Sequence, residues 1–123
     1  MLNKDILVLS GVLNESRNGK IEDFAKKRSD GAKKIADAAK EKGGAALLTY
    51  NHFNVKLPYY DKVAKGKFDF DSMKKEYVKL CSELHSYIDA IEKIDQIKFQ
   101  KLVGKIEALG ELLIEQRASR TAS

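Results

Sequence analysis

The chain has 123 residues, of which 43% are apolar and 33% are charged, with a formal net charge of +5. This length favours one domain and excludes a large two-domain enzyme. The longest apolar runs, such as Ile6 to Leu9, are far shorter than the roughly 20 residues of a membrane span. A single proline gives too few turn signals for a β-sandwich. We therefore expect an all-α protein, a small helical bundle of three long amphipathic helices plus two or three short helices.

The cysteine content and the charge distribution bear on the cellular location and on the class of partner. Cys81 is the lone cysteine and cannot form an internal disulfide, which favours a reducing, cytoplasmic location. Residues 1–67 carry 14 Lys and Arg against 8 Asp and Glu, a net charge of +6, whereas residues 68–123 carry 9 against 10, a net of −1. A basic first half suits an acidic protein surface or a nucleic acid.

The first 19 residues are expected to form an N-terminal arm and linker. Ile6 to Leu9 fits either a short buried strand or, with Leu2 and Leu13, a helical stripe. We prefer a short helix because a lone strand would find no partner for its backbone. Residues 14–19 are polar and predict a linker. The helical bundle domain is then expected at 20–117, with a disordered tail at 118–123.

Residues 20–42 predict an amphipathic helix that ends at the pair Gly43-Gly44, because glycine favours the left-handed conformation of a helix C-cap. One face of this helix collects its apolar residues: Ile21, Phe24, Ala25, Ala32, Ile35, Ala36 and Ala39.

Residues 45–57 are ambiguous between helix and strand. Leu48 and His52 fit a helical face with Ala45 and Val55, but they also alternate with Tyr50 as in a strand. We prefer a short helix here. Pro58 suits the first turn of a further short helix, because its missing N–H would be unpaired there. That helix is expected to run to about Ala64, with Tyr60, Val63 and Ala64 facing inward, and to stop at Gly66.

Two further long helices are predicted at about 72–91 and 96–117, the first capped by Asp71 or Ser72. Their apolar stripes do not join in phase, which indicates a turn near 92–95 with Asp95 as the N-cap and Ile94 packed on Phe99. No glycine or proline marks this turn, so one long bent helix is the alternative to a hairpin. The first stripe contains Met73, Tyr77, Leu80, Cys81, Leu84, Ile88 and Ile91, and the second contains Phe99, Leu102, Val103, Ile106, Leu109 and Leu113.

The densest group of unusual residue types lies between Tyr50 and Lys67, where aromatic residues alternate with lysines. Tyrosine is enriched at the centres of protein interfaces. We expect the function to be binding without catalysis, with a protein partner or a second copy of the chain on an exposed contact group. That group comprises Tyr50, His52, Tyr59 and Tyr60.

The alternative is a nucleic-acid-binding accessory protein, since aromatic residues interleaved with lysines suit base stacking and phosphate contact. For this function the lysines have to converge on one surface. Acidic residues lie four positions from several of these lysines, as in Asp23–Lys27, so the lysines can also be explained as part of a solvated helix face with ion pairs along the surface. The candidate lysines are Lys26, Lys27, Lys33, Lys34, Lys56, Lys62 and Lys65.

A second alternative is a ligand-binding or enzymatic bundle with a pocket formed by Tyr50, His52, Tyr60 and His85, which requires the two histidines to meet. Cys81 and His85 lie four residues apart, but zinc needs at least three protein ligands and no further motif accompanies them. We therefore expect no catalytic residue, metal site or cofactor.

Overall fold

The computed structural model describes the backbone of residues 10–90 and 95–121 and the side chains of residues 21–90 and 95–118. This part of the chain is all-α, as predicted, and contains no strand. Its five helices are α1 (Ser10–Lys42), α2 (Ala46–Asn54), α3 (Leu57–Ala64), α4 (Phe70–Ala90) and α5 (Gln96–Thr121).

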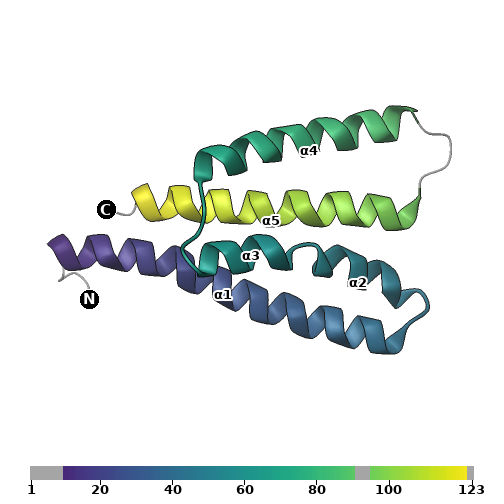
Figure 1. Cartoon of the computed structure of the whole chain (residues 1–123), viewed down its shortest axis with the longest axis horizontal. Helices are drawn as coiled ribbons and strands as arrows, with labels where there is room; N and C mark the ends of the chain where they lie inside the picture. The colour runs from purple at the N-terminus through teal and green to yellow at the C-terminus, as the bar shows by residue number, and fades with distance from the viewer. Residues whose placement is uncertain (1–9, 91–94, 122–123) are drawn as a thin grey trace.

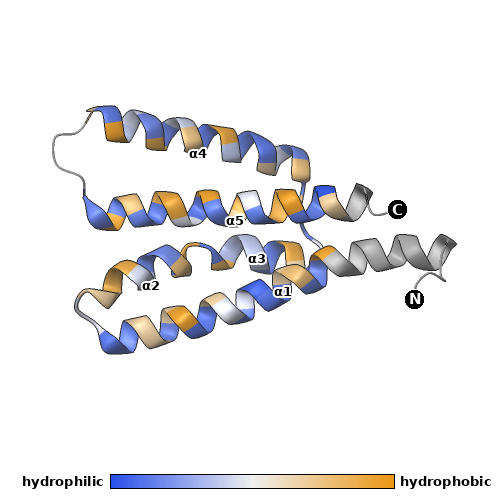
Figure 2. Cartoon of the chain, turned by 180° about the vertical axis from the view of Figure 1, so that it is seen from behind, coloured by the Kyte–Doolittle hydropathy of each residue, from blue (hydrophilic) through white to orange (hydrophobic). Residues whose placement is uncertain are grey.

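Helix α5 lies at the centre of the arrangement (Figure 1). It packs against α4 on one side and against α1, α2 and α3 on the other, and α2 and α3 in turn pack against α1. Figure 2 shows apolar residues recurring along the length of α5. A helix with apolar residues on several faces is stable only when neighbours cover those faces. Four α5 residues supply much of the core: Leu102, Ala108, Leu109 and Leu112.

Helix α1 packs through a stripe of small residues. Ala25, Ala32, Ala36 and Ala39 are buried with Ile21, whereas Ile35 stays 42% exposed. Small side chains let the backbones of α2 and α3 approach closely. Gly43 and Gly44 both have positive φ, at 68° and 57°, which confirms the predicted left-handed helix end.

Helices α2 and α3 form one rod with a break at residues 55–56, just before the first turn that contains Pro58. A proline has no N–H to donate to the carbonyl four residues earlier, and its ring crowds that carbonyl. Helix α2 therefore ends at Asn54. Because Val55 and Lys56 keep right-handed helical angles, the side-chain rows of α2 continue into α3. The helix preference for 45–57 is confirmed, and so is the inward position of Tyr60 and Val63.

Helices α4 and α5 form a hairpin, which resolves the choice between a hairpin and one long helix. Asp95 caps α5 as predicted, its carboxylate accepting hydrogen bonds from the backbone N–H groups of Ile97 and Lys98. The predicted cap of α4 was wrong. Asp69, rather than Asp71 or Ser72, accepts from the Asp71 N–H and from the Ser72 hydroxyl, because the helix begins two residues earlier than expected.

The ends of the chain also differ from the expectation. Helix α1 runs through residues 14–19, and α5 continues to Thr121, so neither the polar linker nor a tail beginning at residue 118 is correct. Low helix propensity costs only fractions of a kcal/mol for residues such as Asn and Ser. The predictions for Ile6 to Leu9 and for the contact of Ile94 with Phe99 lie outside the described residues.

Candidate functional site

The four predicted contact residues separate into two groups. Tyr60 is only 2% exposed, so the expectation that it belongs to an exposed group was wrong. Its ring fills the core beside Val63, and only its hydroxyl finds a polar partner. His52 is mostly covered and contacts α5. Tyr50 and Tyr59 are half-buried, with the Lys40 ammonium 5.9 Å from the Tyr50 ring centre. The structure therefore does not bring the four together on one surface.

A row of polar side chains joins α2 and α3 to α5, and we call it the polar seam. His52, Lys56 and Tyr60 are spaced four apart along α2 and α3, so they stack on one face of the rod. They meet Glu107 and Glu111, which are also four apart on α5. The His52 Nε2 lies 3.0 Å from Glu107 Oε1, and the Lys56 Nζ lies 2.8 Å from the same oxygen.

Further contacts extend the polar seam at both ends. At one end, His52 Nδ1 lies 3.1 Å from Gln100 Oε1. At the other, the Tyr60 hydroxyl donates to Glu111 Oε1, and the Arg28 Nε lies 4.0 Å from that oxygen. The phenol pKa of Tyr60 is raised by burial and by this bond to a carboxylate. The seam thus links α1, the α2–α3 rod and α5 through side chains that satisfy one another.

Lys56 is the unusual member of the polar seam, because it is 4% exposed and charged groups are rarely buried without partners. Its ammonium lies 5.1 Å from the centre of the Phe53 ring and 3.6 Å from Glu111 as well as beside Glu107. Partial burial alone would raise the pKa of Glu107, but the hydrogen bonds and charges of Lys56 and His52 hold it below its ordinary value. The cation and the carboxylates therefore offset each other's desolvation.

The sequence carries a signal for this polar seam that charge counting does not reveal. Lys56 occupies the same helical face as Tyr60, and Glu107 and Glu111 lie four apart on α5, each beside an apolar residue, Ala108 and Leu112. A lysine and two glutamates on faces that must meet a neighbour indicate a buried ion pair. The pattern becomes specific only when the pairing of the two helices is known.

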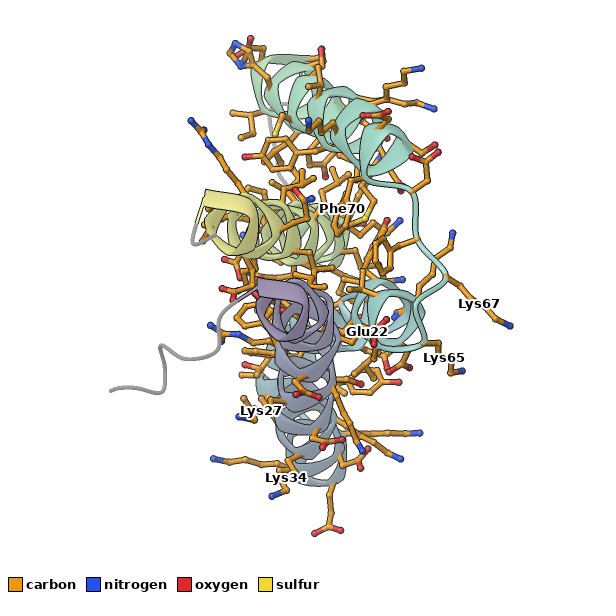
Figure 3. All side chains as sticks on the ribbon, turned by 90° about the vertical axis from the view of Figure 1, so that its left-hand side faces the viewer. Glu22, Lys27, Lys34, Lys65, Lys67 and Phe70 are labelled. Carbon is orange, nitrogen blue, oxygen red and sulfur yellow. The ribbon has the colours of Figure 1, made fainter. Side chains whose placement is uncertain are left out.

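The predicted nucleic-acid-binding lysines do not share one surface. Lys56 is buried and paired, so it is not available to a phosphate, and this part of the prediction was wrong. The other six predicted lysines are exposed. Lys27 and Lys34 point to one side of α1, whereas Lys65 points to the opposite side, beside α3 (Figure 3). The convergence that nucleic-acid binding requires is therefore missing.

The Tyr/His pocket does not form either. His85 lies on α4 with its side chain 77% exposed and 3.7 Å from Asp89. His52 lies on α2, on the other side of α5 (Figure 1). Cys81 is half-buried in the α4 stripe. Within residues 21–90 and 95–118, no group of three or more His, Cys, Asp or Glu side chains has the geometry to hold a metal ion.

A separate feature, which we call the α3–α4 groove, opens between α3, the connector 65–69 and the first turns of α4. Its volume is about 530 Å³, within the range of ligand and side-chain pockets. Its apolar lining comprises Pro58, Val63, Phe68 and Met73, but Val63 and Met73 are buried, so Pro58 and Phe68 present its accessible apolar surface. The polar members of its lining are Tyr59, Lys62, Lys67, Asp69, Ser72 and Glu76.

The groove exists because the connector sets α4 away from α3. Gly66, with φ at 73°, ends α3 in a left-handed turn, and the Lys67 N–H closes that turn on the Lys62 carbonyl. The chain then passes through Phe68 before Asp69 caps α4. The Phe68 ring packs on Phe70 with their centres 4.5 Å apart, which anchors the connector to the core. The connector therefore leaves an open space between α3 and the first turns of α4.

The carboxylates that line the groove are occupied by donors of the chain itself. Glu76 accepts a hydrogen bond of 2.7 Å from the Tyr59 hydroxyl. Both oxygens of Asp69 accept hydrogen bonds, and the Ser72 hydroxyl, followed by backbone N–H groups, holds its pKa below the ordinary value. By contrast, neither Lys62 nor Lys67 has an ion-pair partner within the described part of the chain. The lining therefore carries two cationic and two anionic side chains, and its net charge is zero.

Comparison with protein-family models, with curated proteins and with solved structures gives no match for this chain. None of the described helices is long and apolar enough to cross a membrane. The interpretation of the site therefore rests on the geometry of the polar seam and of the α3–α4 groove.

Proposed function

We propose that the chain is a small helical binding protein, without catalytic activity, that contacts a protein partner through the α3–α4 groove. The observation that carries this proposal is an open groove in which Pro58 and Phe68 present accessible apolar surface and which Tyr59 also lines. Apolar surface that folding leaves accessible is stabilised when a partner covers it. The arrangement as a bundle of three long and two short helices supplies a rigid frame for such a site.

The polar seam supports a structural rather than a catalytic role for the charged groups. Lys56, Glu107 and Glu111 neutralise one another between two helices, and the His52 ring nitrogens both face α5 partners. No cofactor is part of the proposal. The lone cysteine supports a cytoplasmic location. Nucleic acid is the alternative partner, supported by the exposure of six of the seven candidate lysines.

Selection from a random peptide library on the immobilised chain tests the groove as a docking site. The matched variants are Ser72→Trp, which places an indole at the groove, and Ser82→Trp, on an exposed part of the same helix. We expect enriched peptides to bind the native chain and Ser82→Trp but not Ser72→Trp. Equal binding to all three, or no enrichment over the bare support, would refute the proposed function.

A further inference from the structure

We infer that two copies of the chain exchange α5 at high concentration, with α4 and α5 joined into one continuous helix in the exchanged dimer. The α5 of each copy then packs among α1 to α4 of the other. Every contact that α5 makes within one chain is made again between two chains. The inference is independent of the α3–α4 groove, because α4 stays beside the α3 of its own chain.

The turn between α4 and α5 differs from the other reversals of the chain, because its sequence does not oppose a helix. The α1–α2 turn contains Gly43 and Gly44, and the α3–α4 connector contains Gly66, all with positive φ. Residues 91–94 have the sequence Ile-Glu-Lys-Ile, with neither glycine nor proline, and both Glu and Lys favour a helix. The sequence of this turn therefore permits α4 to continue into α5.

The hairpin is held closed by side chains at the start of α5. The Asp95 carboxylate accepts hydrogen bonds of 3.0 and 3.2 Å from the N–H groups of Ile97 and Lys98. The Asp95 N–H donates to the Tyr87 hydroxyl at 2.8 Å. In a continuous helix these three N–H groups would instead bond to carbonyls one turn earlier. A single substitution that removes the Asp95 cap therefore favours the continuous helix.

The pairing of α4 with α5 has the symmetry that the exchanged dimer needs. The two helices lie side by side and antiparallel (Figure 1), and the Tyr77 ring lies against Gly110. The midpoint between these two residues in the sequence falls within the 91–94 turn. Two continuous helices related by a two-fold axis at this point place Tyr77 of each copy against Gly110 of the other. The exchanged dimer thus keeps the observed register.

The first measurement is the molecular mass by light scattering over a wide range of protein concentration. The native chain is compared with Asp95→Ala, which removes the cap of α5. The matched control is Asp69→Ala, which removes the hydrogen bonds to the Asp71 N–H and the Ser72 hydroxyl at the start of α4. This control weakens a helix start of the same kind, but at a connector that Gly66 keeps from becoming helical.

The second measurement is a distance within one chain, which separates exchange from association of intact copies. Spin labels are placed at Lys74→Cys and Ile114→Cys, both exposed positions, in a chain that also carries Cys81→Ser. Labelled chains are diluted with unlabelled chains, so that pulsed electron resonance reports the distance within one chain. In the hairpin the two labels lie on packed neighbouring helices, whereas in a continuous helix they are about 60 Å apart.

We expect the native chain to be monomeric at low concentration and to dimerise only at the highest concentrations. Asp95→Ala should lower the dimer dissociation constant about thirtyfold, because each of the two chains no longer loses a cap when its hairpin opens. The dimer should show the distance of about 60 Å. Asp69→Ala should change the dissociation constant by less than about threefold.

Three outcomes would overturn the inference. A dimer that keeps the short distance would show that the copies associate through their surfaces without exchange. An equal effect of Asp69→Ala would show that general destabilisation, rather than the turn, promotes dimerisation. A folded Asp95→Ala variant that stays monomeric at millimolar concentration would show that the cap does not decide between the two forms.

A further variant decides the question if Asp95→Ala fails to fold. Glu92→Asn/Lys93→Gly introduces residues that favour a turn over a helix. It should weaken the dimer that the native chain forms. An unchanged dissociation constant, or a native chain that stays monomeric at millimolar concentration, would then refute the exchange.

Discussion

The two sides of α5 meet their neighbours in opposite ways. Toward α4 the contact is apolar and aromatic, with the Tyr77 ring against Gly110. Toward α2 and α3 the contact contains the polar seam and a closer backbone approach, since a side chain at Gly104 would collide with the His52 carbonyl. On the α4 side, α5 is stabilised by the apolar area that the two helices bury. On the α2–α3 side, the charged pairs also fix one alignment of the helices, because a shift would separate the charges from their partners.

The largest expected loss of stability comes from adding a side chain where α5 and α2 approach most closely. An alanine Cβ at Gly104 would lie 2.2 Å from the His52 carbonyl oxygen, a backbone atom that cannot move alone. We expect Gly104→Ala to reduce the free energy of unfolding by about 3 kcal/mol, measured by urea denaturation.

Gly110→Ala is the matched control for this change on the α4 side. Its Cβ would lie 3.3 Å from the Tyr77 ring, which needs only a small shift, and alanine favours the helix by about 1 kcal/mol. The free energy of unfolding should then stay within about 1 kcal/mol of the native value. Equal losses in the two variants would contradict the proposed difference between the sides.

The next effect comes from removing the buried cation. Lys56→Met leaves Glu107 and Glu111 without their ammonium partner. We expect a loss of about 2 kcal/mol, less than for fully buried pairs because both carboxylates are partly exposed. Calorimetric unfolding measures it.

Two further variants show whether the loss arises from unpaired charge. Lys56→Met combined with Glu107→Gln and Glu111→Gln should regain part of the stability, because no carboxylate is left unpaired. Lys98→Met removes an exposed lysine over the Tyr87 ring on the α4 side and should cost at most about 1 kcal/mol. If the triple variant is less stable than Lys56→Met alone, unpaired carboxylates are not the cause of the loss.

A smaller effect is expected from the tyrosine hydroxyls. Tyr60→Phe removes a donor to Glu111 within the core, and we expect the free energy of unfolding to fall by about 1.5 kcal/mol. Tyr77→Phe removes a hydroxyl whose polar neighbour, within the described residues, is the weakly polar Cys81 thiol, so about 0.5 kcal/mol or less is expected. Thermal melts should show a larger loss of stability for Tyr60→Phe than for Tyr77→Phe, and the reverse order would contradict the prediction.

The smallest effect is a pH dependence confined to the polar side. The pKa of Glu107 is lower in the folded chain than its ordinary value of 4.5, so the unfolded chain takes up the proton first as the pH falls. The contribution of Glu107 to stability is complete above about pH 4.5 and disappears as the pH passes through the lowered pKa. The difference in stability between the native chain and Glu107→Gln should narrow in this window, and a constant difference would contradict the shift.

Much of the fold followed from local patterns. Three- and four-residue spacing predicted the long helices, while Gly43-Gly44, Pro58 and Asp95 marked real ends and breaks. These signals work because capping and backbone restriction act within one turn of the chain. The cap at Asp69 was missed because several acidic and hydroxyl residues compete there, and the choice depends on where Phe68 and Phe70 pack.

The site was less predictable because it depends on which helix faces meet. Tyr59 belongs to the proposed binding surface as expected from its residue type, but Tyr60, one position later, points into the core. Lys56 and Lys62 look alike in the sequence, yet one is buried against α5 and the other lines the α3–α4 groove. Only the pairing of α3 with α5 and the path of the connector distinguish them.

The central position of α5 also determines when the chain can fold during its synthesis. Helices α1 to α4 leave the ribosome before α5, so the nascent chain holds Lys56 without its carboxylates and leaves the α4 stripe uncovered. Cooperative folding therefore waits for the final described helix, and truncation before Gln96 should yield a collapsed, protease-sensitive polypeptide rather than a smaller native protein.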